Sequence, residues 1–332
     1  MRCYFGRAAR ALPLVILAIA LPLNVAAQRT RRGAAARKAQ GREPAVRFDS
    51  GGSALRIPLE IDNNIILMPV SVNGSKPLKF IFDTGASHNV ISSRRAAELG
   101  LKIEGTGKGS GTGGTFQMSY TRGVSLGVPG AEVSEQLVAS MPFPTIPGFE
   151  FDGTIGYDFI NQFVVEIDYQ NKIMSLYDPR AYAYRGAGRV VPLVLAGRRT
   201  PLAHTTISLE GRAPIGARLE VDTGADGAFV INSPFVRKHG LLSAIPETTQ
   251  GGAVGAGGEQ QLRVGRVKAV RLGRLVIDNP AVGLSLDAEG AGASEENDGL
   301  IGGEVFRRFK VILDYSRRRM ILEPNSDFGD PY

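Results

Sequence analysis

Alternating apolar and polar positions run through the chain from residue 53 onward and predict short β-strands. Paired strand patterns are joined by turn sequences at Asn73-Gly74 and at Glu210-Gly211, so each pair is expected to form a hairpin. A long stretch with helical periodicity is evident nowhere in the sequence. The pattern therefore predicts an all-β fold with short helices.

Signals for one short helix follow each hairpin. The first helix is expected to begin near Ser92 and to end at Gly100-Leu101, and the second to begin at Ser233-Pro234 and to end at Gly240-Leu241. Serine favours the N-cap, proline the first helical turn, and glycine the left-handed residue after the last turn. The same local order is therefore present twice.

These features belong to an internal repeat. The tetrapeptide Asp-Thr-Gly-Ala begins at Asp83 and again at Asp222, each time after an apolar run. A second pair of similar segments, residues 151–158 and 297–304, precedes two strand-like stretches. The copies are 139 residues apart at the tetrapeptide and 146 apart in the later stretches, and a loop insertion of seven residues explains the difference.

Length and composition agree with two globular lobes. Of the 332 residues, 43% are apolar and 21% charged, and the 42 glycines and the lack of tryptophan favour turn-rich β structure. We predict an N-terminal lobe of residues 53–185 and a C-terminal lobe of residues 186–332.

The first 27 residues have the pattern of a secretory signal peptide. Three arginines precede an apolar stretch over residues 11–23, and small residues at 25–27 offer a cleavage site. About 13 apolar residues fall short of the roughly 20 that span a bilayer, although an uncleaved anchor is the alternative. We expect an exported protein, periplasmic or secreted, starting near Gln28. The only cysteine, Cys3, would leave with the signal, so the exported chain would have no disulfide.

The formal charge of +7 comes from the N-terminal region. Three arginines lie in the signal and residues 28–52 carry a local +5, which leaves −1 for residues 53–332. We interpret residues 28–52 as a disordered basic leader, either a solvated linker or a short propeptide, that could contact anionic surfaces weakly. The folded part gives no reason to expect a nucleic-acid partner.

An Asp-Thr-Gly-Ala loop followed later by two apolar residues and glycine resembles the aspartic protease family, and its retropepsin branch in particular. The resemblance covers residues 53–325. In that family a strand ending in apolar-apolar-glycine crosses each aspartate loop. Residues 154–156 (Thr-Ile-Gly) and 300–302 (Leu-Ile-Gly) match it, with threonine in one apolar place. The resemblance implies a bilobal acid-protease fold, in which two homologous retropepsin-like β-barrel lobes enclose a cleft.

Asp83 and Asp222 are the candidate catalytic residues. Cleaving a peptide without a metal or a cysteine or serine nucleophile takes a base that activates water and an acid that protonates the amide. Two adjacent carboxyls sharing one proton supply both, because like charges about 3 Å apart cannot both ionise easily. The sequence thus predicts a dyad with a raised apparent pKa, without assigning the proton to either residue.

The neighbours of the aspartates are candidate supports for the dyad. Gly85 and Gly224 let the backbone pass close to the substrate and the carboxyls, and the resemblance implies that Thr84 and Thr223 tie the two loops together. Alanine follows in both copies, where pepsin-like relatives place a hydroxyl donor to the aspartate. Loss of that donor leaves the pair more basic, so we expect a mildly acidic pH optimum.

Substrate contacts are predicted from the resemblance. The aspartate that matches Asp226 binds substrate backbone in viral retropepsins, although turn capping is an equal alternative here. Glycine-rich residues 105–114 and 251–258 take the place of the family's flaps, hairpins that close over the substrate, with a flexible loop as the alternative. Gly111 and Gly113 in the first stretch are candidate substrate-binding residues.

Other chemistries fit the sequence less well. The glycines at 109–114 match a dinucleotide fingerprint formally, but no helix pattern follows them. The three histidines lack zinc-protease spacing, and His88 is expected to pack or hydrogen-bond beside the first aspartate loop. The acidic run from Asp287 to Asp298 lacks the ligand pattern of a calcium loop. We expect no metal and no cofactor.

The sequence therefore predicts an exported aspartic endopeptidase that cleaves an extended polypeptide and acts as a monomer with an internal pseudo-dimer. The alternative is a non-catalytic peptide-binding envelope module on the same fold, because fold does not fix function. Pairing of equivalent lobes between two chains is a third arrangement, against which the tandem copies argue.

Overall fold

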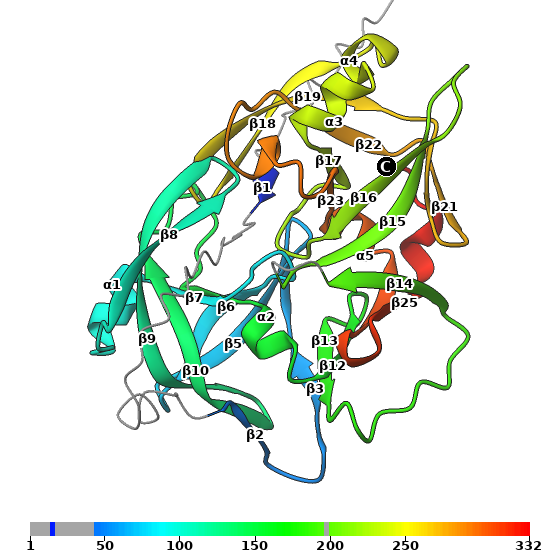
Figure 1. Cartoon of the computed structure of the whole chain (residues 1–332). Helices are drawn as coiled ribbons and strands as arrows, with labels where there is room; N and C mark the ends of the chain where they lie inside the picture. Colours follow the sequence, from blue (N-terminus) through cyan, green and yellow to red (C-terminus); the bar gives the residue numbers. More distant parts are fainter. Residues whose placement is uncertain (1–13, 17–42, 196–198) are drawn as a thin grey trace, which may run out of the picture.

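The computed structural model describes residues 14–16, 43–195 and 199–332 (Figure 1). The strands form two sheets, one of nine and one of sixteen strands, and the helices are short. The predicted all-β, two-lobed fold is therefore confirmed. Most of the predicted signal peptide, residues 1–13 and 17–27, lies outside the described residues. No helix in the described part of the chain is long and apolar enough to cross a membrane.

The N-terminal lobe is the nine-stranded sheet, in the order β2-β10-β7-β11-β6-β5-β9-β8 with β4 beside β5. A further pairing of β10 with β9 closes it into a barrel. Its elements are β2 (Ala45–Phe48), β4 (Glu60–Asp62), β5 (Ile65–Val72), β6 (Leu78–Phe82), β7 (Asn89–Ser92), α1 (Ser93–Glu98), β8 (Gly105–Gly111), β9 (Gly114–Val128), β10 (Ala131–Met141), β11 (Gly153–Ile155) and α2 (Tyr157–Ile160).

The C-terminal lobe repeats this arrangement, with β18, β19, β22, β17, β23, β16 and β15 side by side. Its elements are β15 (Pro201–Ser208), β16 (Ile215–Val221), β17 (Phe229–Ile231), α3 (Ser233–Lys238), α4 (Leu241–Ala244), β18 (Thr249–Gly255), β19 (Gly258–Arg266), β20 (Ala269–Leu272), β21 (Leu275–Asp278), β22 (Ala281–Ser285), η2 (Ala291–Ala293), β23 (Gly299–Ile301) and α5 (Gly303–Phe306). The short strand β1 (Leu14–Ile16) adds in parallel to the outer edge of β18.

A layer of six strands from both halves joins the lobes. It consists of β3 (Ser53–Pro58), β13 (Ile173–Tyr177), β12 (Val164–Asp168), β24 (Phe309–Asp314), β25 (Arg319–Pro324) and β14 (Arg189–Leu195), with η3 (Tyr315–Arg317) and η4 (Ser326–Gly329) at its C-terminal end. The central pair, β12 and β24, is the repeated strand-like stretch, with Glu166 opposite Ile312 in antiparallel register. The two copies therefore meet about a local two-fold relation.

Buried apolar side chains fix the lobes to each other. One continuous cluster runs through both halves and includes fully buried phenylalanines on each side of the shared layer, among them Phe163 and Phe309. Burying large aromatic side chains is among the strongest stabilising contributions in a core. The two aspartate loops are thus carried on lobes that share one continuous core.

The predicted hairpins and helix signals are present. Strands β5 and β6 pair across Asn73-Gly74, and β15 and β16 pair across Glu210-Gly211. The hydroxyl of Ser92 caps α1 by accepting a hydrogen bond from a backbone N–H at 3.3 Å. Gly100 and Gly240 both adopt the left-handed conformation, with φ of 64° and 59°. The helix-end glycines therefore do what the sequence predicted.

The second helix begins at Ser233 as predicted, but its predicted N-cap is wrong by one residue. Asn232 is the N-cap of α3 and makes no capping hydrogen bond, whereas Ser233 is the first helical residue. The Ser233 hydroxyl donates instead to the backbone oxygen of Asp287 at 2.6 Å. A tertiary partner for the hydroxyl thus replaces the local one that the sequence suggested.

The predicted leader ends earlier than residue 52. Residues 45–48 form β2, which pairs antiparallel with β10, so this part is ordered rather than disordered. The Phe48 ring packs edge-on against Phe163 with centroids 5.8 Å apart. The open edge of β10 and this aromatic contact give the segment a place in the sheet, while residues 28–42 lie outside the described ranges.

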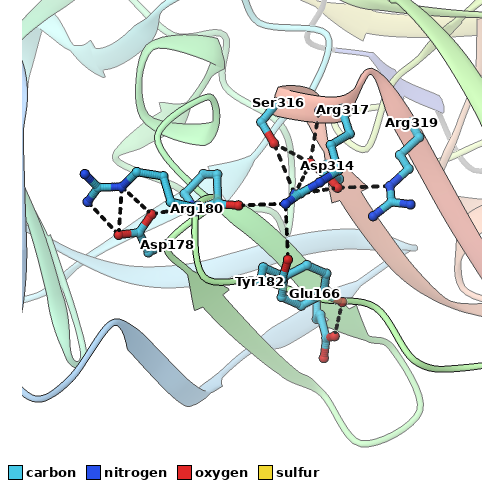
Figure 2. Close-up of polar contacts among 9 residues, drawn as sticks. Glu166, Asp178, Arg180, Tyr182, Asp314, Ser316, Arg317 and Arg319 are labelled. Atoms are coloured by element: carbon cyan, nitrogen blue, oxygen red, sulfur yellow. Dashed lines mark hydrogen bonds and ion pairs between the residues drawn. The ribbon is translucent and has the colours of Figure 1, made fainter.

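Polar contacts fasten the segment between β13 and β14 to the shared layer (Figure 2). Arg317 donates to the backbone oxygens of Pro179 and Tyr182 at 3.1 and 3.2 Å and pairs with the buried carboxylate of Asp314. The Tyr182 hydroxyl donates to Glu166 at 2.6 Å. The predicted boundary between the lobes, at residues 185 and 186, falls within this segment.

Candidate active site

Asp83 and Asp222 stand at equivalent places, directly after β6 and β16. The crossing strands β11 and β23 pair in parallel with these two strands, and their last residues accept the backbone N–H of each aspartate, at 3.0 Å from Ile155 and 2.9 Å from Ile301. The apolar-apolar-glycine segments therefore lie where the sequence predicted. Thr154, the residue out of pattern, is fully buried with a hydroxyl that has no hydrogen-bond partner.

The two aspartates face each other, each against the glycine of the opposite loop. A Cβ built on Gly85 would lie 2.8 Å from Cγ of Asp222, and one built on Gly224 would lie 2.4 Å from Cγ of Asp83. Real side-chain atoms do not approach so closely, so only glycine permits this juxtaposition. The predicted roles of Gly85 and Gly224 thus have a direct geometric basis.

Thr84 and Thr223 tie the two loops together in a reciprocal pattern. The Thr84 hydroxyl donates to the backbone oxygen of Val221 at 2.5 Å and accepts the N–H of Thr223 at 3.0 Å. The Thr223 hydroxyl donates to the backbone oxygen of Phe82 at 2.8 Å and accepts the N–H of Thr84 at 3.2 Å. Both threonines are buried, so these bonds hold the carboxyls in register without competition from solvent.

Backbone N–H groups donate to only one oxygen of each aspartate carboxyl, Oδ1. Oδ1 of Asp83 accepts from the N–H groups of Gly85 and Ala86 at 2.8 and 3.0 Å, and Oδ1 of Asp222 accepts from Gly224 at 2.9 Å. Oδ2 of each aspartate is buried and receives no donor from the described protein. A hydrogen bond between the two carboxyls therefore requires a shared proton.

Burial raises the pKa of both aspartates. Both side chains are fully buried. The pKa of Asp83 rises well above its ordinary value, first because burial disfavours the charged form and then because of the neighbouring charge of Asp222. Burial likewise raises the pKa of Asp222 to about 6, and backbone donors partly offset the rise. The pair is therefore set to keep a proton in mildly acidic solution.

The two glycine-rich stretches form hairpins, one in each lobe, where the flaps were predicted. The glycine-rich stretches form the antiparallel pairs β8–β9 and β18–β19, which reach toward each other in Figure 1. Their tips touch, since the N–H of Gly113 donates to the backbone oxygen of Ala256 at 3.1 Å and a Cβ on Gly113 would lie 2.2 Å from the Gly258 backbone. The first stretch is thus a hairpin rather than a nucleotide-binding turn.

A family model for aspartyl proteases matches this chain in two separate regions, residues 68–159 and 205–305. Each region contains one aspartate loop, its flap and its crossing strand. The chain belongs to the aspartyl protease family. No curated protein gave a significant match to it. The two matched regions of this aspartyl protease agree with the tandem, two-lobed arrangement.

The remaining predicted substrate-binding residues of the aspartyl protease lie in the first flap hairpin and just after the second tetrapeptide. Gly111 ends β8, opposite Gly114 in the flap pairing, and Gly113 sits in the adjoining turn. Asp226 follows the second tetrapeptide and is 9% exposed, with its backbone oxygen accepting from Asn64 Nδ2 at 2.9 Å. Their contacts with substrate stay a prediction.

Sequence reasoning missed a second buried polar group beside the first dyad loop. His88 Nδ1 lies 2.6 Å from Asp158 Oδ2, and Arg199 Nη1 donates to Asp158 Oδ1 at 2.5 Å. A hydrogen bond of His88 was expected, but its partner Asp158 was not predicted. The sequence does indicate an acidic side chain here, because an acidic residue follows the crossing strand in both copies, Asp158 in one and Glu304 in the other. No group of His, Cys, Asp and Glu suited to hold a metal occurs within the described ranges.

Proposed function

We propose that the chain is an exported aspartic endopeptidase that hydrolyses peptide bonds with water activated by Asp83 and Asp222. The proposal rests on one observation: two buried carboxyls face each other, and Oδ2 of each receives no hydrogen bond from the described protein. Buried acceptors are rarely left unpaired without a reason. We expect a water molecule and the scissile carbonyl of the substrate to be the hydrogen-bond partners of these two Oδ2 atoms.

The reaction needs one proton on the pair. The ionised carboxyl removes a proton from water as the water oxygen bonds to the carbonyl carbon, and the protonated carboxyl gives its proton to the carbonyl oxygen. The nitrogen of the tetrahedral diol then takes the proton of the protonated carboxyl as the C–N bond breaks, and one hydroxyl of the diol gives its proton to the ionised carboxyl as the new C=O bond forms. The products are a carboxylic acid and an amine, and the dyad again holds a single shared proton.

The flaps determine how substrate reaches this site. Both aspartates are fully buried and the tips of the two flap hairpins touch, so we expect the flaps to open when a polypeptide enters. An extended substrate can then pair its backbone with flap strands, as β1 pairs with the edge of β18. Export rests on the N-terminal sequence pattern alone, and we propose a periplasmic or secreted monomer whose basic leader touches anionic surfaces weakly.

Cleavage of a denatured protein tests the proposal. The purified chain should degrade reduced, unfolded casein at pH 4–6, and Asp83→Asn should abolish this turnover while retaining the fold by circular dichroism. The control variant Glu247→Gln changes an exposed side chain away from the dyad and should keep full activity. Saturable peptide binding without any cleavage between pH 3 and pH 8 would instead support the non-catalytic module.

A further inference from the structure

Because the chain is an internal repeat, the residues beside the aspartate loop of one lobe have equivalents in the other lobe. In the N-terminal lobe the backbone N–H of Tyr157, at the start of α2, donates to Ala86 at 2.9 Å, and in the C-terminal lobe Gly303, at the start of α5, donates to Ala225 at 2.6 Å. The next residues, Asp158 and Glu304, are therefore equivalent. Both carry a carboxylate close to an aspartate loop.

The N-terminal carboxylate is neutralised by a cation from the other lobe. Arg199, just before β15, forms an ion pair with Asp158, and its guanidinium also lies over the Tyr157 ring, 5.7 Å from the centroid. His88 takes the other oxygen of Asp158. Both oxygens of Asp158 therefore have a partner.

The C-terminal carboxylate has no such partners. The residue equivalent to His88 is Gly227, which has no side chain, and the backbone oxygen of Asn64 lies beside Gly303, the residue equivalent to Tyr157. Asn64, however, donates its amide to the backbone of Asp226. Within the described part of the chain, the Glu304 side chain forms no hydrogen bond or ion pair.

A cavity of about 560 Å³ lies beside Gly227 and Glu304 in the C-terminal lobe. Gly227 and Glu304 line it on the side of the dyad loop, and the flap strands β18 and β19 line it with small and aliphatic residues such as Ala253 and Leu262. Among the described residues that line it, Glu259 is the only other charged one, and none is Lys or Arg. The cavity is thus apolar with an acidic end.

We infer that this cavity receives a lysine or arginine side chain of the polypeptide substrate, with Glu304 as the residue that selects it. The inference rests on the proposed function. A long aliphatic stem would cover the apolar wall while the cationic end pairs with Glu304, as Arg199 pairs with Asp158 in the other lobe. The substrate would supply in the C-terminal lobe the cation that the protein itself supplies in the N-terminal lobe.

The position of the flap strand supports a side-chain pocket. Residues 251–254 of β18 line the cavity, and the outer edge of that strand accepts an added strand at Ala253–Gly255. An extended peptide on this edge directs alternate side chains to one face. One side chain next to the scissile bond can therefore enter the cavity while the backbone stays paired with the flap.

Peptide cleavage with matched side chains tests the inference. A proteome-derived peptide library is digested with the purified chain and the cut sites are read by mass spectrometry. Lys or Arg should be enriched at one fixed position near the cut. Synthetic substrates with Lys, Gln or Glu at that position should then differ, with kcat/KM for Lys exceeding that for Gln by roughly tenfold, as expected for a charge-assisted hydrogen bond in a partly buried site.

Variants assign the preference to Glu304. Glu304→Gln should remove most of the advantage of the Lys substrate over the Gln substrate, and Glu304→Lys should shift the preference toward Glu. Glu247→Gln removes an equal charge from an exposed place in the same lobe and should leave the Lys advantage intact.

The outcomes separate this inference from the proposed function. Cleavage without enrichment of Lys or Arg, or an enrichment that Glu304→Gln leaves unchanged, would overturn the inference and leave the peptidase intact. Absence of cleavage of every library peptide would overturn the proposed function and the inference together.

Discussion

Replacing a dyad aspartate should make the protein more stable at neutral pH while it removes activity. Burial raises the pKa of Asp222 from 3.8 to about 6. A carboxyl whose pKa is raised by folding contributes stability below its unfolded pKa, and this contribution is lost as pH rises through the folded pKa. At about 1.4 kcal/mol per pH unit, the folded state carries a penalty of about 3 kcal/mol at pH 7.5 that is absent at pH 3.5.

Asp222→Asn removes the titrating group but keeps its shape and an oxygen that can accept from Gly224. Urea unfolding should therefore give a free energy of unfolding about 3 kcal/mol above wild type at pH 7.5, and nearly equal to it at pH 3.5. Asp298→Asn, at a partly exposed ion pair with Arg218, is the control and should show no such gain at pH 7.5. Equal changes at both pH values, or destabilisation at pH 7.5, would refute the argument from burial.

Four further predictions concern the dyad and its cover. Gly224→Ala places a Cβ 2.4 Å from Cγ of Asp83 and should lower kcat by at least about 100-fold, with a folded protein by circular dichroism; near-normal turnover would contradict the facing geometry. Thr84→Val leaves two buried backbone groups without partners and should lower the free energy of urea unfolding by about 3 kcal/mol, whereas a loss below about 1 kcal/mol would deny the link between the loops a structural role. Gly113→Val blocks the contact of the flap tips and should reduce kcat/KM without changing the urea midpoint; unchanged kinetics would show that the flaps need not meet. The pH–rate profile should peak in mildly acidic solution and fall above about pH 6, as the dyad loses its shared proton, and a peak below about pH 3 would contradict the raised pKa values.

Features encoded in local sequence were predictable. The turn at Asn73-Gly74, the cap at Ser92 and the left-handed Gly100 depend on residues within a few positions of one another, so the sequence reveals them directly. The dyad was also predictable, because the repeat places Asp83 and Asp222 at equivalent ends of equivalent strands. Internal duplication thus supplied long-range information that a single motif lacks.

Features that depend on contacts between distant segments were not predictable. Arg199 reaches Asp158 from the other lobe, and nothing near either residue indicates the partner. The same holds for β2, whose place depends on the open edge of β10, and for Ser233, whose hydroxyl prefers a carbonyl 54 residues away. In each case the tertiary partner, and not local propensity, decides the outcome.

The most direct test of a shared dyad is the initial rate of casein cleavage by Asp83→Asn, Asp222→Asn and the double variant, measured at the pH optimum of the wild type. Because a single proton is shared by two carboxyls, the loss of either should abolish the reaction, and the double variant should be no slower than either single variant. All three rates should lie at the same background. A single variant with wild-type activity, or single losses that multiply in the double variant, would contradict the account.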